Sequence, residues 1–539
     1  MKQDDSKPVF SFFSSLMIIG IGLSNFFIRK SKVPSLFNYI FFYSSNVGFL
    51  FLRFFSVLFF FYIIYKEKSI RKFLPLLFTY VVFIVLEEFI FIHGVFIYDF
   101  GDVSNFEGMG NVIGKLVSIG TTKLNLQTNE AWIIASQIKL LISKTAFFVD
   151  FYFVIYNIVL FFIISGKTTL DVLVHGIEIQ LLFMIPFGIV ELLYIWGFSW
   201  ANVLVENIFV KLYDIGSNTT WWPPIHWPGM RNIFGESSFL VVYCSISIPF
   251  LLYYAFHKKK IIYFIEFFIL LFFSFSTNGR TSFVIWGQFF VFLLASIIGN
   301  AKKYFKYAII IFCLVICSFF LSALLLYFSP LNLVPNNYSI KKESYNYNLD
   351  NHNQLVLASE SYFDYNISTL TSLDTRSNGA RFSNIIACIN VWKKHPLLGV
   401  SDSLSSKYMI EELDQFRSNG EVNLWITFQE KDSLLKGFYS YVSGYFKSLS
   451  EGGIVGIICD YFPVFILVLG CSIKFVFDAI NRNVSVLDIL CLTVLSAIFV
   501  VEFNCASIIN IPFVVVIIAF ISTLFVNDKK SWREECLKV

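Results

Sequence analysis

One arginine stands out because nothing near it in the sequence is charged. Arg280 lies in the stretch SFSTNGRTSF and is the only charged residue between Glu266 and Lys302. The apolar run at residues 261–276 would form a helix roughly 24 Å long, and the Asn-Gly pair that follows it is a strong turn signal. We therefore expect Arg280 in a tight hairpin between two membrane-spanning helices.

The expected position of Arg280 suits the binding of an anion. Thr281 and Ser282 can cap the next helix, whose N-terminal amides and dipole favour negative charge. A guanidinium group beside these amides, at the membrane surface, would fit a phosphate of a lipid head group. The alternative is an interface arginine that snorkels to the surface without binding a ligand.

A second group of candidates lies in the stretch WWPPIHWPGMRNIFGESSF, residues 221–239. The faces of Trp222 and Trp227 can stack on sugar rings and Arg231 can bind phosphate, which together indicate a glycolipid site. An aromatic belt at the membrane interface is the structural alternative for the tryptophans. Glu236 lies about one and a half helical turns from Arg231. We expect it either to pair with that arginine or to act as a general base.

A third group lies in DTRSNGARFSNIIACINVWKKHPLLGV, residues 374–400. Arg376 and Arg381 bracket a Ser-Asn-Gly turn at the start of an amphipathic helix that Pro396 ends. The apolar residues of this helix fall at helical spacing, at Ile385, Ile386, Ile389 and Trp392. His395 can titrate near neutral pH, but a straight helix would hold it roughly 21 Å from Arg381. We therefore expect His395 to be structural, with catalysis as the alternative.

The composition is that of an integral membrane protein. Of 539 residues, 56% are hydrophobic, 14% are charged and 67 are phenylalanine, a combination that water-soluble domains do not approach. The net charge of +4 is spread over many short loops, so we expect no nucleic-acid partner. The nine cysteines show neither zinc-ligand spacing nor a disulfide framework, and we expect no metal or cofactor.

The apolar runs predict an all-α polytopic membrane protein with about twelve transmembrane helices. Their expected positions are residues 10–28, 46–65, 73–96, 146–165, 172–196, 237–256, 261–277, 282–299, 307–328, 453–477, 485–503 and 507–526. With both chain ends on one side, most clusters of lysine and arginine fall on a single face, which the positive-inside rule makes cytoplasmic. Residues 131–144 form either an interfacial helix or a further partial span, so eleven or thirteen spans remain alternatives.

The hydrophilic stretches divide the chain into four expected regions. These are N-terminal helices and outward loops at 1–236, helices around the Arg280 hairpin at 237–328, a large outward loop at 329–452, and C-terminal helices with a cytoplasmic tail at 453–539. Because the large loop shows helical apolar periodicity, we expect a small helical cap on the membrane surface rather than a disordered linker.

Four motifs follow one another on the same expected face: RNIFGESSF, STNGRTS, RFSNIIACINVWKKHPLLGV and YVSGYFKSLSEGGIVGI. With these motifs in this order, the chain resembles the O-antigen polymerase and ligase superfamily over roughly residues 200–480. The resemblance implies a metal-independent glycosyltransferase of the C-type membrane architecture, placed in the bacterial inner membrane with its active site facing the periplasm. The implied partners are an oligosaccharide linked to undecaprenyl pyrophosphate, membrane lipid, and a chain-length regulator protein.

The resemblance also implies roles for individual residues. Arg280 and Arg381 match the family arginines expected to hold the donor pyrophosphate, with Arg231 and Arg376 as supporting contacts. The other candidates are the general bases Glu236, Glu451 and His395, in falling order, and the sugar-binding side chains Trp222, Trp227 and Tyr445.

One departure from the family pattern bears on the reaction. Ligases of this superfamily have a histidine followed by asparagine where this chain has Ser443-Gly444. That histidine is the supposed base for transfer to the lipid A core. Its absence favours a polymerase, which joins repeat units by inverting glycosyl transfer.

Two other functions remain alternatives. A ligase would transfer a finished glycan to the lipid A core or to protein, and a flippase would move lipid-linked sugars without forming a glycosidic bond. Charged residues in or near spans are typical of transporters, and here they are Arg53, Glu87, Glu88, Asp150, Glu178, Glu191 and Glu502. The long folded outward loop is less typical of a transporter.

Overall fold

The computed structural model describes a largely helical chain. The described residues are 7–26, 46–98, 112–165, 169–204, 207, 229–234, 237–277, 280–327, 376–402, 404–432, 441–481, 484–504 and 511–536. No β-strand occurs among them. The predicted all-α polytopic class is confirmed.

The helices follow one another along the whole described chain. The first half forms α1 (Lys7–Gly22), α3 (Val47–Glu67), α4 (Leu74–Ile97), α5 (Val112–Lys123), α6 (Thr128–Phe148), α7 (Val154–Ser165), α8 (Thr169–Ile195) and α9 (Ser199–Leu204). The second half forms α11 (Ser237–Lys258), α12 (Ile261–Phe275), α13 (Phe283–Tyr327), α15 (Arg376–Lys394), α16 (Ser405–Leu413), α17 (Gly420–Asp432), α18 (Gly444–Ile480), α19 (Val486–Asn504) and α20 (Pro512–Cys536).

Apolar helices occupy all the positions that hydropathy predicts. Within the described residues, 8 helices are long and apolar enough to cross a membrane, and the shorter apolar helices Val9–Gly22, Ile261–Phe275, Phe283–Ile298 and Pro512–Leu524 fill the remaining expected positions. The agreement has a simple cause. A backbone in hydrocarbon must satisfy its own hydrogen bonds, so a long apolar run has little choice but to form a helix.

Residues 131–144 belong to a longer helix than the sequence predicts. The apolar helix runs from Thr128 to Ser165 over 38 residues, with a single π-helical turn at Val149–Phe153 between α6 and α7. Gln127 and Glu130 form a capping box at its start, which accounts for its beginning well before the predicted span. The segment is therefore neither a separate span nor a separate interfacial helix.

The segment α13 is a hairpin of two antiparallel helices. The ring centroids of Trp286 and Phe319 lie 5.7 Å apart, as do those of Phe289 and Phe312. A straight helix would separate Trp286 from Phe319 by roughly 50 Å, so the two halves of α13 must run antiparallel. These halves are the separate spans predicted at 282–299 and 307–328.

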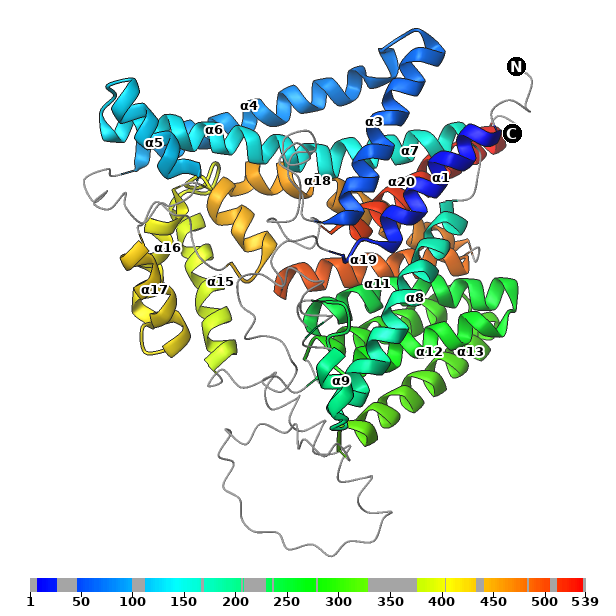
Figure 1. Ribbon diagram of the computed structural model, residues 1–539. Helices are drawn as coiled ribbons and strands as arrows, with labels where there is room; N and C mark the ends of the chain where they lie inside the picture. The colour runs from blue at the N-terminus through cyan, green and yellow to red at the C-terminus, as the bar shows by residue number, and fades with distance from the viewer. Residues whose placement is uncertain are drawn as a thin grey trace, which may run out of the picture.

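Helices α15, α16 and α17, which belong to the predicted large loop, pack beside the start of α18. Figure 1 shows α15, α16 and α17 grouped on one side of the molecule next to α18, whereas α11, α12 and α13 lie together on the other side. A compact core of small and apolar residues holds the three loop helices together. The loop is thus partly helical, and its helices are anchored to α18; its position on the membrane surface stays a prediction.

The buried face of α15 differs from the predicted one. The side chains that pack inward are small or polar, namely Ala380, Ser383, Asn384, Ala387, Cys388 and Val391, whereas Ile385, Ile386, Ile389 and Trp392 are only partly buried. Small side chains allow α15 to approach α16, α17 and α18 closely, and this packing decides which face turns inward. The first turn also differs, because the expected Ser-Asn-Gly turn lies within α15, which begins at Arg376.

A buried ion pair ties α3 to the π-helical turn. Arg53 is 3% exposed, and its guanidinium group donates two hydrogen bonds to the carboxylate of Asp150. The neighbouring Tyr152 donates from its hydroxyl to the backbone carbonyl of Cys459 on α18. The turn therefore joins three membrane helices, which gives Asp150 a structural role.

We predict that breaking this pair destabilises the protein more than replacing it. Arg53→Met leaves a buried carboxylate without its partner and should cost about 3–5 kcal/mol. The double variant Arg53→Met with Asp150→Leu should recover most of that loss, because no buried charge remains. Thermal unfolding in detergent measures both effects, and a double variant as unstable as the sum of the single variants would contradict the prediction.

Candidate active site at the α18 kink

The segment that follows α15 docks on α18 where that helix is interrupted. Gly453 has φ of 61° and ψ of −152°, so the helix divides there. Residues 396–402, which we call the strap, run alongside residues 450–455, which we call the kink. Four backbone hydrogen bonds join them: Val400 N to Ser450 O at 3.1 Å, Ser401 N to Glu451 O at 2.7 Å, Ile454 N to Pro396 O at 3.0 Å, and Val455 N to Leu397 O at 3.1 Å. The strap thus satisfies backbone groups that the interruption frees.

Glycines make this close approach geometrically feasible. Gly399 and Gly453 both have positive φ, at 58° and 61°, a backbone conformation that other residues adopt at a cost. A Cβ atom on Gly399 would lie 2.5 Å from the carbonyl of Glu451, and one on Gly453 would overlap the backbone of Leu397. The motifs HPLLG and SEGG therefore require glycine at these two positions.

Helix α4 holds the strap from its other side. A Cβ atom on Gly94 would lie 2.8 Å from both the Cβ of Ser401 and the carbonyl oxygen of Val400. The strap is therefore clamped between α4 and α18, at the end of α4 from which the chain enters an expected outward loop.

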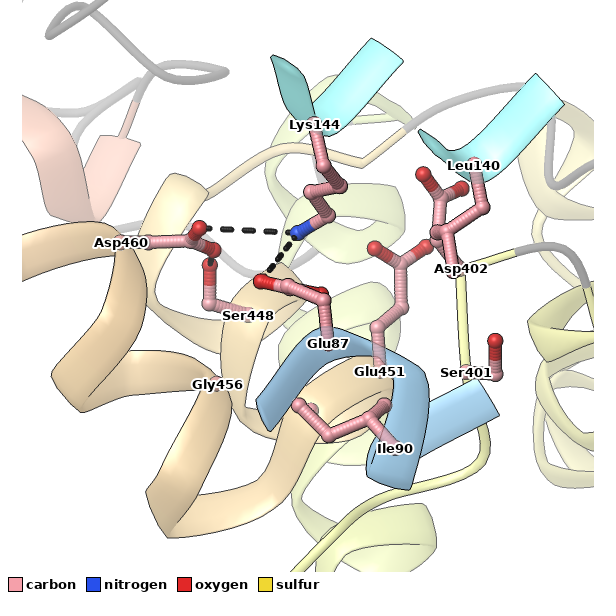
Figure 2. A pocket seen from close by; sticks show the side chains of 11 residues that line it. Glu87, Ile90, Leu140, Lys144, Ser401, Asp402, Ser448, Glu451, Gly456 and Asp460 are labelled. Carbon is pink, nitrogen blue, oxygen red and sulfur yellow. Dashed lines mark hydrogen bonds and ion pairs between the residues drawn. The ribbon is translucent and has the colours of Figure 1, made fainter. Parts of the chain in front are cut away.

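A charged pocket lies beneath the strap. Figure 2 shows Lys144 of α6 between two carboxylates, with its ammonium 3.0 Å from Glu87 of α4 and 3.6 Å from Asp460 of α18. Ser448 donates a hydrogen bond to Asp460. The lining is completed by Ile90, Leu140, Ser401, Asp402, Glu451, Gly452 and Gly456. Three membrane helices and the strap thus contribute polar groups to one space.

Glu451 sits at the wall of this pocket with two fixed partners. It is 8% exposed, its Oε1 accepts a hydrogen bond of 3.1 Å from Ser405, and its Oε2 lies 3.7 Å from the ammonium of Lys447. The backbone carbonyl of Glu451 is held by the strap. A carboxylate positioned in this way from both its main chain and its side chain is suited to act on a bound group.

Asp402 at the end of the strap remains ionised near the pocket. Desolvation raises its pKa, but the positive charges of Lys447, Lys139 and Lys144 outweigh that effect and hold the pKa below its usual range. The site therefore contains an anionic carboxylate at neutral pH, which can accept a hydrogen bond.

His395 ends α15 and leads into the strap, as its helix-stop motif predicts. Its ring centroid lies 6.1 Å from that of His93 and 5.7 Å from that of Tyr408. Burial, the neighbouring His93 and Lys394 together lower the pKa of His395. It is thus neutral at physiological pH, and it packs between α4 and α16 rather than among the residues that line the pocket.

The second pair of motifs also meets in space. The amide of Met230 donates to the carbonyl of Ser276 at 2.9 Å, which sets the RNIF segment against the end of α12 and the start of the Arg280 hairpin. Arg231 is 1% exposed, and its amide and that of Asn232 donate to the carboxylate of Glu191 at 2.8 and 2.6 Å. The carboxylate that binds the backbone at Arg231 therefore belongs to Glu191 of α8.

For the other predicted arginines, the structure gives the position in the secondary structure. Arg280 begins a 3₁₀ turn at Arg280–Ser282 that leads directly into α13, so the capping residues Thr281 and Ser282 form this turn. Arg376 begins α15, and Arg381 is exposed on the same helix. The Asn-Gly turn before Arg280 lies outside the described residues.

Several candidates remain predictions. Glu236, Trp222 and Trp227 lie outside the described residues. Tyr445 is 6% exposed and packs in an aromatic cluster, with ring centroids 4.7 Å from Tyr461 and 5.1 Å from Phe503.

Ser443-Gly444, the family departure, stands at the start of α18. Ser443 donates from its hydroxyl to the carbonyl of Glu502 at 3.0 Å. A Cβ atom on Gly444 would overlap the carboxylate of Glu502 and the hydroxyl of Tyr461. The position where ligases have asparagine therefore has no room for a side chain in this structure.

Some residues that line the pocket were not among the predicted site residues. Lys144, Asp402 and Asp460 are not among them, and Glu87 is noted only as a charge near a span. The signal that could have found two of them is an isolated charge in an apolar run, as in LLISKTAFF and GIICDYFPV. In the part of the chain that the structure describes, no group of three or more His, Cys, Asp or Glu side chains is arranged to hold a metal ion.

We predict that Gly453→Ala releases the strap. The added methyl group must adopt a positive φ, which costs about 1–3 kcal/mol, and it overlaps the backbone of Leu397. The variant should unfold at lower temperature and expose the outward loop to limited proteolysis. Gly287→Ala is the matched control, because a Cβ there has nothing within 4 Å and alanine favours a helix by about 1 kcal/mol. Equal protease resistance of the two variants would contradict the prediction.

Comparison with known protein families gives a match that spans the strap and the kink of this site. The family model described as O-antigen ligase matches residues 265–460, which include Arg280, the strap and Glu451. No match to a curated protein was found. Members of this family are membrane enzymes that transfer glycosyl groups. This match over residues 265–460 is consistent with the resemblance to the O-antigen polymerase and ligase superfamily that the motifs indicate.

Proposed function

We propose that the protein is a polymerase of O-antigen or a related surface polysaccharide. It joins oligosaccharide repeat units carried on undecaprenyl pyrophosphate, at the periplasmic face of the bacterial inner membrane. The observation that carries this proposal is the docking of the strap on the kink, within the segment that matches the family, because this docking presents Glu451 beside a polar pocket.

The proposed reaction is a single inverting displacement. A hydroxyl oxygen of the acceptor's terminal sugar forms a bond to the anomeric carbon of the donor, while the bond from that carbon to the pyrophosphate oxygen breaks. The electron pair of the broken bond leaves with the pyrophosphate, and Glu451 takes the hydroxyl proton. The growing chain thereby moves from its lipid carrier onto the next repeat unit.

The arginines serve the leaving group in this proposal. Arg280 and Arg381 bind the pyrophosphate, and Arg231 and Arg376 support them, because guanidinium groups neutralise phosphate through paired hydrogen bonds without a metal. The dipoles at the starts of α13 and α15 add to this, since Arg280 lies in the turn before α13 and Arg376 begins α15. In this proposal Trp222, Trp227 and Tyr445 contact the sugars.

Polymerisation is favoured over ligation by the start of α18. The ligase pattern places a histidine and an asparagine where Ser443 and Gly444 stand, and the space that an asparagine would need is filled by Glu502 and Tyr461. A chain-length regulator is the protein partner expected for a polymerase. The surface polysaccharide of a deletion strain separates the functions, because loss of the ligase would leave long polymer unattached, whereas loss of the polymerase would leave single repeat units.

We predict that Arg280→Ala abolishes long chains and leaves single repeat units on the lipid carrier or core. Arg280→Lys should restore only part of the activity, because an ammonium group cannot bind phosphate in the same bidentate way. The ladder of chain lengths on a gel measures both. Arg417→Ala is the control, since this exposed loop arginine pairs only with Asp414 and Glu430 among the described residues. A normal ladder from Arg280→Ala would refute the assignment.

A second prediction identifies the base. Glu451→Gln keeps the shape of the side chain but removes the proton acceptor, and it should slow elongation by roughly 10²–10⁴-fold. His395→Gln should leave elongation within about threefold of wild type, because His395 packs against α4 and α16 rather than lining the pocket. Purified protein supplied with lipid-linked repeat units gives both rates. The opposite ranking would make His395 the base, and translocation without new glycosidic bonds would indicate a flippase.

A further inference from the structure

The pocket beneath the strap contains a buried hydroxyl that the described structure does not use. Ser401 is 0% exposed and lines the pocket. Its Oγ has no hydrogen-bond partner among the described residues, although its amide is held by the carbonyl of Glu451 at 2.7 Å. A buried hydroxyl without a partner costs free energy, so an unused one at a pocket wall indicates a missing ligand atom.

The backbone of Ser401 is held in a strained conformation. Its φ of 68° lies in the left-handed region, which is unusual for a residue other than glycine, asparagine or aspartate. Clamping by Gly94 on one side and by the kink on the other maintains this conformation. Figure 2 shows the side chains of Ser401, Asp402 and Glu451 around the same space.

Five other polar residues that line the pocket already have hydrogen-bond or ion-pair partners. Lys144 is shared by Glu87 and Asp460, Ser448 donates to Asp460, and Glu451 accepts from Ser405. Lys144 therefore offsets the charge of two carboxylates. A ligand atom entering beside Ser401 would meet one hydroxyl, which can donate or accept, and the carboxylates of Asp402 and Glu451, which can only accept.

The size of the space restricts what can enter it. The pocket holds about the volume of one water molecule, so a sugar ring cannot fit. A single hydroxyl group can fit, and it matches the lining because it accepts one hydrogen bond and donates another. Asp402, Lys144 and Asp460 are each half-buried, so the pocket is not sealed from the surface and the rest of a sugar can remain outside.

We propose that Ser401 and Asp402 form the subsite for the attacking hydroxyl of the acceptor sugar. Ser401 donates a hydrogen bond to the hydroxyl oxygen, the hydroxyl donates its only proton toward Glu451, and Asp402 accepts a hydrogen bond from a neighbouring hydroxyl of the same sugar. This inference rests on the proposed function and adds the residues that select the acceptor over the donor. Both substrates are lipid-linked, but the acceptor presents the hydroxyl of its terminal sugar to this pocket, whereas the donor presents its pyrophosphate-linked anomeric carbon.

Separate titration of the two substrates tests this subsite. The acceptor probe is the repeat-unit oligosaccharide released from its lipid by mild acid, and the donor probe is the intact unit on undecaprenyl pyrophosphate. For Ser401→Ala and Asp402→Asn, we expect the half-saturating concentration of the acceptor to rise at least about tenfold. That of the donor should stay within about twofold. Unchanged acceptor saturation in both variants would overturn the proposal.

Two controls remove the effect of lost stability. Ser56→Ala removes a buried hydroxyl that is satisfied within α3 by the carbonyl of Leu52, so it should change neither saturation curve. Ser401→Gly removes the hydroxyl and also relieves the positive φ, so it should fold at least as well as wild type and still lose acceptor affinity. Full acceptor affinity in Ser401→Gly would show that the effect of Ser401→Ala is structural.

Saturation-transfer NMR with the released oligosaccharide separates this inference from the proposed function. If wild-type protein forms no glycosidic bond but gives a saturation-transfer signal that Ser401→Gly and Asp402→Asn lose, the polymerase assignment fails and the saccharide subsite stands. If elongation proceeds and the signal is equal in all variants, the subsite is wrong and the polymerase assignment stands.

Discussion

The candidate site depends on one interaction, the pairing of the strap with the interrupted backbone of α18. A helix that breaks inside a membrane protein leaves amides and carbonyls without intrahelical partners, and these are costly unless another segment satisfies them. Here the strap satisfies them from the outward loop, and Gly399 and Gly453 allow contact at backbone distance. The loop and the membrane helix consequently form one unit, and the position of Glu451 follows from both.

The charges within the helices behave as local pairs. Arg53 binds Asp150, Lys144 lies between Glu87 and Asp460, and Lys474 of α18 pairs with Asp478 at 3.0 Å and with Asp488 of α19. Each group joins neighbouring helices, as expected when a buried charge is retained only with a partner. The pairs of Arg53 with Asp150 and of Lys474 with Asp478 and Asp488 lie outside the pocket, so these charges have a structural role in helix packing and need no transport pathway to explain them.

The sequence predicts those parts of the fold that one segment determines by itself. Apolar length fixed the spans, and the Pro396 stop placed the end of α15 correctly. The charged pocket could not be predicted in the same way, because Lys144, Asp460 and Ser401 come from three segments whose proximity depends on packing. The prediction of which face of α15 is buried was wrong for the same reason. Ala387 and Cys388 are buried because small side chains allow close contact between helices, which hydropathy does not reveal.

An inverting displacement places a geometric demand on the chain that this fold is suited to meet. The nucleophile and the leaving group must act on opposite faces of the anomeric carbon, so the groups that hold them are best supplied by different elements. The Arg280 turn belongs to the α12 and α13 hairpin, whereas Glu451, Ser401 and Asp402 belong to the strap and the kink. Helix α19 contacts α11, α13 and α18, and it therefore sets the distance between the proposed phosphate-binding and hydroxyl-binding sides. Glu502, near the end of α19, also accepts from Ser443 through its carbonyl, so the position of α19 fixes the start of α18 as well.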